Sequence, residues 1–131
     1  MADGPTLENT DAFMSQRFCL ALDLVDDAKL IAEYEAWHQP GRTPTPIIRS
    51  ILDSGIDNME IYRAGNRMFM IIEANDSYSS ESKGRADAVN PDVRRWTALM
   101  KQFQQPVPAA GPQGTWIEMQ RVFRLTDHSD R

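Results

Sequence analysis

Residues 17–24 read Arg17-Phe18-Cys19-Leu20-Ala21-Leu22-Asp23-Leu24, a nearly continuous apolar run. A run of this length is typical of a β-strand that is buried on both of its faces. A second such run, Met68-Phe69-Met70-Ile71-Ile72, follows about fifty residues later. The sequence therefore predicts two central strands, around which the remaining elements are arranged.

The segments around these two runs predict two further strands and three helices. Residues 56–63 and 116–125 alternate between apolar and polar side chains, which favours half-buried strands. Residues 75–88 are polar and read as a loop with some helical character. Helix-capping residues and turn formers predict one helix from Asp26 to about His38, one from Pro46 to Gly55, and one opened by Asn90 and Pro91.

The resulting element order is β-α(α)-β-β-α-β. Two fully buried and two half-buried strands fit a four-stranded antiparallel sheet in the order 4-1-3-2, an α+β fold with the ferredoxin-like split βαβ arrangement. Helices cover one face of this sheet, so we expect a homodimer to cover the other. Residues 15–125 form a single domain, with a flexible tail at 1–14 and a second tail at 126–131.

Composition narrows the classes of partner and compartment. The 131 residues carry a net charge of −5, which argues against nucleic acid or an anionic membrane as a partner. A small molecule or another protein remains open. The single cysteine, Cys19, rules out an intrachain disulfide, fits the cytoplasm and reads as a small buried hydrophobe. The first residues have neither the basic nor the apolar region of a signal peptide.

Tyr34 and His38 are the strongest candidates for chemistry. Residues four apart lie one above the other on a helix, and this pair shares its face with Leu30, Ile31 and Trp37. Imidazole titrates near neutral pH, so one interpretation is an acid–base pair that faces a substrate. The other is a core tyrosine next to a histidine that is satisfied at a helix C-terminus. The residues alone leave both open.

Two other residues have a functional and a structural interpretation. Trp96 follows two arginines and fits either a sugar-binding wall or the core. Glu73 ends an apolar strand, so it either emerges into solvent or enters a pocket. The chain lacks CxxC, HxH, HExxH, GxGxxG, Walker A and GxSxG motifs. We therefore expect no cofactor and no metal; only a Mg²⁺ site from scattered carboxylates stays open.

With these residues in place, the chain from Arg17 to Leu125 resembles the L-rhamnose mutarotase family. The resemblance implies a dimeric α/β barrel of ferredoxin-like subunits that interconverts sugar anomers without a cofactor. It also implies that His38 is the proton donor, that Tyr34 binds the sugar and that Trp96 lines the pocket. The segments that carry it are 33–40, 55–62, 66–73, 95–100 and 122–125.

Some positions differ from the rhamnose-type pattern. Met59 stands where those members have a second pocket tyrosine, and Thr97 stands where they have a second tryptophan. The loop at 41–46 lacks the family's tryptophan, while residues 59–62 and 103–106 resemble the L-fucose branch. We expect Met59, Thr97, Asn58 and Glu73 to complete the substrate site.

The sequence thus predicts a cytoplasmic isomerase that acts on a 6-deoxy-L-hexose, either L-fucose or L-rhamnose. Two alternatives remain. Dimeric ferredoxin-like barrels also include cofactor-poor monooxygenases and haem-degrading enzymes, in which His38 would be an axial ligand. The altered loop at 41–46 also fits a non-catalytic dimer that binds or senses a sugar.

Overall fold

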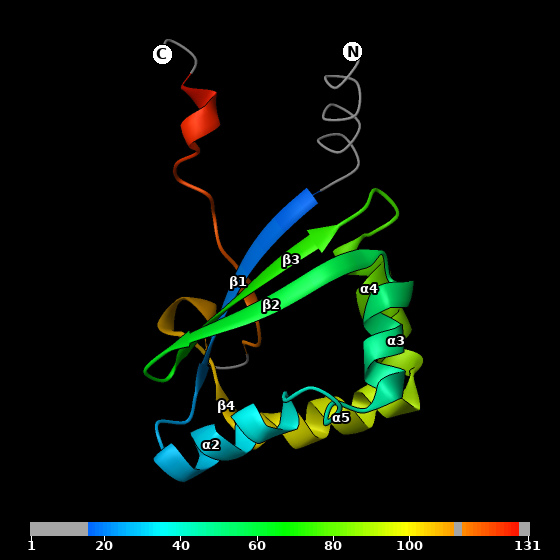
Figure 1. The fold of residues 1–131 in the computed structure, drawn as a ribbon, viewed down its shortest axis with the longest axis vertical. Helices are drawn as coiled ribbons and strands as arrows, with labels where there is room; N and C mark the ends of the chain where they lie inside the picture. Colours follow the sequence, from blue (N-terminus) through cyan, green and yellow to red (C-terminus); the bar gives the residue numbers. More distant parts are fainter. Residues whose placement is uncertain (1–15, 112–113, 129–131) are drawn as a thin grey trace.

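The computed structural model describes residues 16–111 and 114–128, so the tail predicted for residues 1–14 lies outside the described residues. Figure 1 shows three long strands side by side, with the α helices grouped toward one side of them. The elements are β1 (Gln16–Leu24), α2 (Ala28–Trp37), α3 (Thr45–Asp53), β2 (Ile56–Ala64), β3 (Arg67–Ala74), α4 (Ser80–Val89), α5 (Pro91–Lys101), β4 (Gln104–Gln105), η1 (Pro108–Ala110), β5 (Ile117–Glu118) and η2 (Leu125–Asp127).

The sheet has the predicted antiparallel order. β1 pairs with β3 along its whole length, and β3 pairs with β2. The other edge of β1 pairs with both β4 and β5, so the order is β2-β3-β1 followed by these two short strands. This is the predicted 4-1-3-2 arrangement, and the α+β class is confirmed.

The predicted strand at 116–125 is wrong in its extent. Only Ile117 and Glu118 join the ladder, opposite Ala21 and Leu20. One more hydrogen bond follows, from the Met119 N–H to the Cys19 carbonyl oxygen at 2.7 Å, and the chain then leaves the sheet. Figure 1 shows this orange-to-red segment running away from the helices. Alternation specifies which side chains share a face, but it does not supply a neighbouring strand.

Helix caps agree with the sequence at α5 and differ by one residue at α2. The Asn90 side chain accepts hydrogen bonds from the backbone N–H groups of Asp92 and Val93, as predicted. At α2 the cap is Asp27, whose carboxylate accepts from the Leu30 N–H at 3.0 Å, and not the predicted Asp26. Adjacent aspartates are equivalent in a sequence pattern, and only the backbone path selects one of them.

Residues 80–89 form helix α4, where the sequence predicted a polar loop with some helical character. Ser79 caps the helix and accepts from the Ser82 N–H, and Lys83 pairs with Asp87 one turn later at 2.7 Å. None of its residues is buried. The helix has no apolar stripe, so the periodicity that reveals most helices was missing.

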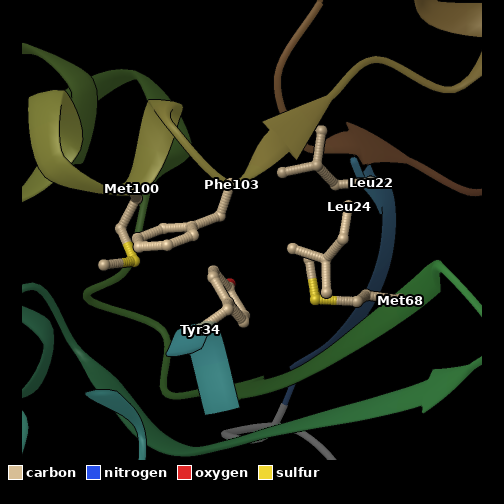
Figure 2. Packing of buried hydrophobic residues seen from close by; sticks show 6 residues of the cluster. All are labelled: Leu22, Leu24, Tyr34, Met68, Met100 and Phe103. Carbon is tan, nitrogen blue, oxygen red and sulfur yellow. The ribbon is translucent and has the colours of Figure 1, made fainter. Parts of the chain in front are cut away.

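The main core lies between the helices and one face of the sheet. Figure 2 shows Tyr34 between Met100 and Phe103 on one side and Leu24 and Met68 on the other. Leu22 and Leu24 of β1 point into this core, and Phe18 and Leu20 pack against a second apolar cluster. Odd-numbered residues of β1 point to the opposite face, where Phe69 and Ile71 of β3 are only partly buried. The cluster comprises Leu22, Leu24, Tyr34, Met68, Met100 and Phe103. Within the described ranges, no helix is long and apolar enough to span a membrane.

Candidate functional site

A cavity of about 360 Å³ lies between α2 and the helix-facing side of β2 and β3. Its volume falls in the range of small-molecule sites, roughly 300–1,000 Å³. The wall combines apolar side chains from the sheet with polar side chains from the helix. It is lined by Tyr34, Glu35, His38, Gln39, Ile61, Arg63 and Met68.

Tyr34 joins the core to the cavity. Its side chain is 4 % exposed, and its ring meets that of Phe103 edge-on with centroids 5.9 Å apart. Burial disfavours the phenolate and raises the pKa of Tyr34 to about 12, while a hydrogen bond from the Gln104 side chain acts in the opposite direction. The hydroxyl therefore stays protonated at neutral pH and is available as a hydrogen-bond donor.

His38 follows the last residue of α2 and has its proton position fixed by the helix. Nδ1 lies 2.7 Å from the carbonyl oxygen of Tyr34. A carbonyl oxygen only accepts hydrogen bonds, so Nδ1 carries the proton and Nε2 keeps its lone pair. Burial lowers the pKa of His38 from its ordinary value of 6.5, and the bond to the Tyr34 backbone partly opposes this shift. The resting imidazole is therefore neutral, with Nε2 as its basic atom.

The aromatic rings of Tyr34, His38 and Trp96 form one group. The imidazole centroid lies 4.3 Å from that of Tyr34 and 5.6 Å from that of Trp96, which reaches it from α5. Trp96 also meets Trp37 edge-on at 6.0 Å. The structure thus brings together the three residues that the resemblance assigned to the site, and it makes Tyr34 both a core residue and a neighbour of the imidazole.

The loop at 41–46 closes a second, smaller hollow behind Trp96. The Thr43 hydroxyl donates to the carbonyl oxygen of Trp37 at 2.9 Å and so fastens the loop to the end of α2. Pro44 and Pro46 then line a hollow of about 170 Å³ that also has Trp37 and Trp96 in its wall. The loop therefore supports the far side of Trp96, although it has no tryptophan of its own.

Other predicted site residues are distributed over both faces of the sheet. Met59 lies on the helix-facing side of β2, like Ile61 of the cavity wall. Asn58 and Glu73 are register partners on the opposite face, and Glu73 pairs there with Arg17 at 2.7 Å. Strand alternation thus places these two on the face opposite to the cavity of His38.

Thr97 is exposed on α5 and lines neither hollow, although it adjoins Trp96 in sequence. The second histidine, His128, lies far along the sequence from Tyr34, His38 and Trp96. Its ring stacks on that of Phe123, with centroids 4.9 Å apart. Over the described ranges, no three His, Cys, Asp or Glu side chains are grouped so that they could hold a metal ion.

Two charged residues of the cavity were missed. Arg63 Nε donates to Glu35 Oε2 at 2.6 Å across the space between β2 and α2. The signals were present in the sequence. Arg63 has the same strand parity as Met59 and Ile61, and Glu35 precedes His38 by three residues on the helix.

The chain is similar to known sugar mutarotases over most of its length. Residues 17–125 match the family model described as L-rhamnose mutarotase. An L-fucose mutarotase from Xanthomonas campestris pv. campestris is 39 % identical over 112 residues, covering 86 % of this chain and 90 % of the relative. A UPF0734 protein from Dictyostelium discoideum is 30 % identical over 112 residues, covering 82 % and 88 %. The crystal structure of an L-rhamnose mutarotase from Formosa agariphila shares the fold with a TM-score of 0.61 at 19 % identity, covering 84 % of this chain and 98 % of that one.

Proposed function

We propose, from the premise that the chain belongs to the L-rhamnose mutarotase family, that it interconverts the α and β anomers of a 6-deoxy-L-hexose. It is an isomerase that acts on carbohydrates. The observation that carries the mechanism is a neutral imidazole with a free Nε2, next to a protonated phenol in a cavity of about 360 Å³. Family membership favours neither the monooxygenase-type barrel nor the non-catalytic dimer.

The reaction needs one proton acceptor and one proton donor. Ring opening removes the proton from the anomeric hydroxyl, adds a proton to the ring oxygen and breaks the bond between the anomeric carbon and that oxygen. The free aldehyde then rotates, and ring closure runs the same transfers backwards onto the other face of the carbonyl. Protons and electrons balance over the cycle, so one side chain that accepts the anomeric proton and one that donates toward the ring oxygen suffice.

His38 and Tyr34 fit these two tasks. The Nε2 lone pair of His38 accepts the anomeric proton during opening, and the imidazolium returns it during closure, which makes His38 the donor in that step. The Tyr34 hydroxyl donates toward the ring oxygen, and Trp96, which lines the neighbouring hollow, meets the imidazole of His38 edge-on. Met59 packs against a second apolar cluster that contains Ile56 and Ile72 and lines neither hollow, and Asn58, Thr97 and Glu73 do not line the cavity of His38 either.

Anomer exchange measured by saturation-transfer NMR tests this proposal. We expect the protein to accelerate exchange of L-fucose most, because the relative at 39 % identity is an L-fucose mutarotase. L-rhamnose and a sugar with a hydroxymethyl group in place of the methyl group complete the panel. If no 6-deoxy-L-hexose exchanges faster than in buffer, the proposed activity is wrong.

We also propose a cytoplasmic homodimer that covers the helix-free face of the sheet. This face carries partly buried Phe69 and Ile71, and the segment after β5 exposes Phe123. Apolar surface of this kind is typical of an interface between subunits. The lone Cys19 fits a reducing compartment.

Sedimentation velocity tests the homodimer. We expect a dimer for the unmodified chain and a monomer for Ile71→Asp, because a buried unpaired carboxylate opposes association. Ile48→Asp on the exposed side of α3 is the matched control and should leave the dimer intact. A monomeric unmodified chain would contradict the proposal.

A further inference from the structure

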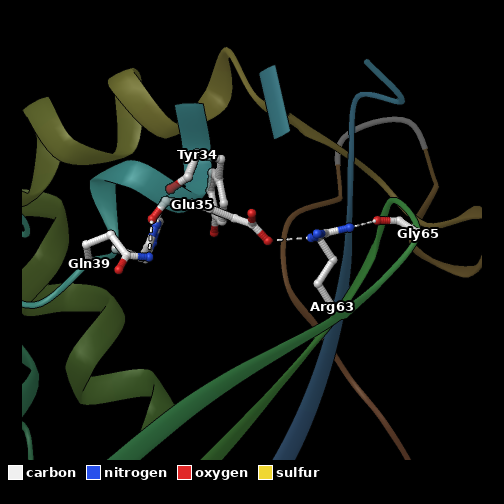
Figure 3. Close-up of polar contacts among 6 residues, drawn as sticks. Tyr34, Glu35, Gln39, Arg63 and Gly65 are labelled. Carbon is white, nitrogen blue, oxygen red and sulfur yellow. Dashed lines mark hydrogen bonds and ion pairs between the residues drawn. The ribbon is translucent and has the colours of Figure 1, made fainter. Parts of the chain in front are cut away.

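The Glu35–Arg63 pair lies in the wall of the His38 cavity and joins two elements. Figure 3 shows the Glu35 side chain extending from α2 toward Arg63 on β2. Arg63 Nε donates to Glu35 Oε2 at 2.6 Å, and Arg63 Nη1 donates to the Gly65 carbonyl oxygen at 2.7 Å. These two bonds hold the guanidinium in one orientation beside the cavity.

Both partners keep hydrogen-bonding capacity for a ligand. A guanidinium has five N–H donors, and the contacts among the described residues engage two of those of Arg63. Within the same ranges, the carboxylate of Glu35 accepts through Oε2, and Oε1 has no recorded donor. Fixed donors therefore lie next to a fixed acceptor at the edge of the cavity.

Fold stability gives only a weak reason for this pair. The side chains of Arg63 and Glu35 are 35 % and 47 % exposed. Ion pairs with this much contact with water contribute little to the stability of a domain. α2 is held on the sheet by the burial of Tyr34 against Leu24 and Met68. The position of the pair in the cavity wall therefore needs another explanation.

We propose that the Glu35–Arg63 pair recognises two adjacent non-anomeric hydroxyls of the sugar; this inference rests on the proposed function of the same cavity. A sugar hydroxyl both donates and accepts. One hydroxyl donates to Glu35 Oε1, and its neighbour accepts from a free N–H of Arg63. Glu35 and His38 are three residues apart on one helix, so their Cβ atoms lie about 5–6 Å from each other, similar to the width of a pyranose ring. The sugar can then reach His38 with its anomeric carbon and the pair with its opposite side.

Neutralising either partner tests this recognition. We expect Glu35→Gln and Arg63→Met to raise KM for L-fucose exchange by about 10- to 100-fold, the range for hydrogen bonds to charged groups. We expect kcat to change less than about threefold, because an interaction made equally in ground and transition states affects only KM. Glu81→Gln and Arg85→Met, from an exposed pair at 3.6 Å on α4, are the matched controls and should leave KM unchanged.

An exchanged pair separates recognition from a structural role. The double variant Glu35→Arg with Arg63→Glu restores opposite charges between α2 and β2 but reverses the donors and acceptors that the sugar meets. We expect its Tm to match that of the unmodified chain while its KM stays raised. Full recovery of KM in this variant, or an unchanged KM in both single variants, would overturn the inference.

A binding measurement distinguishes this inference from the proposed function. Quenching of Trp37 and Trp96 fluorescence by L-fucose reports occupancy without turnover. If the unmodified chain binds the sugar but does not exchange it, and Arg63→Met weakens binding, the pair recognises sugar and the proposed activity fails. If exchange is normal and neither variant changes binding, the activity stands and the inference fails. Absence of both binding and exchange overturns both.

Discussion

Replacing His38 with Ala is expected to lower kcat for anomer exchange by about 10²–10⁴-fold, the usual contribution of a general acid–base group. The variant removes Nε2, the basic atom that the hydrogen bond to the Tyr34 carbonyl leaves free. His38 does not belong to the buried core cluster, so the variant should still bind sugar and keep the circular dichroism spectrum of the unmodified chain. His38→Asn is a second variant, whose side-chain amide takes the place of Nδ1 toward the Tyr34 carbonyl but has no counterpart of Nε2, and it should be equally slow. An exchange rate within a factor of two of the unmodified chain would refute the role of His38.

The pH profile of the unmodified chain identifies the form of His38 that is active. Burial lowers the pKa of His38 below 6.5, so the neutral form dominates at pH 7. As the pH falls through this lowered pKa, Nε2 becomes protonated, and kcat/KM should fall with it. The pKa of Tyr34, about 12, predicts no alkaline loss at mildly alkaline pH. Saturation-transfer NMR between about pH 5 and pH 9 measures this pH dependence of kcat/KM. A rate that rises on acidification would mean that the protonated imidazolium of His38 is the active form.

Replacing Leu22 with Ala is expected to reduce the free energy of unfolding by about 2–5 kcal/mol. Leu22 is 1 % exposed in the middle of β1, where it packs in the cluster that contains Tyr34 and Phe103. The truncation removes apolar burial and leaves a cavity that the rigid neighbours on β3 cannot fill. Urea unfolding followed by tryptophan fluorescence gives the difference.

Leu52→Ala on α3 is the matched control for this change. Leu52 is 57 % exposed, so the same truncation should change the free energy of unfolding by about 0.5 kcal/mol or less. Equal losses in the two variants would mean that β1 is not the centre of the core. Because Leu22 and Tyr34 share that cluster, Leu22→Ala should also slow anomer exchange, whereas Leu52→Ala should not.

Local sequence patterns predicted much of the fold, but they did not predict the features that depend on contacts between distant segments of the chain. The apolar runs of β1 and β3 and the Asn90 cap follow from neighbouring residues. The extent of helix α4 was underestimated because the helix has a cap and polar pairs but no apolar stripe. The extent of the fourth strand was overestimated because the local sequence at residues 119–125 does not indicate that two short strands share the edge of β1.

The same division holds for the site. Tyr34 and His38 are one helical turn apart, so their proximity was readable from the sequence alone. Trp96 joins them from α5, and the residues alone left it open between a sugar-binding wall and the core. The Glu35–Arg63 pair spans 28 residues, and spacing alone does not show which charges meet over such a distance.

The hydrogen bond that holds the proton on Nδ1 of His38 is also part of the C-terminal end of α2. Helix ends open far more readily than whole domains unfold. Each opening of this last turn releases the Tyr34 carbonyl and lets the imidazole exchange between its two tautomers. With the role proposed for His38, the competent fraction depends on the local stability of this single helical turn, which Thr43 fastens through the Trp37 carbonyl. Heating should switch the site off before it melts the domain.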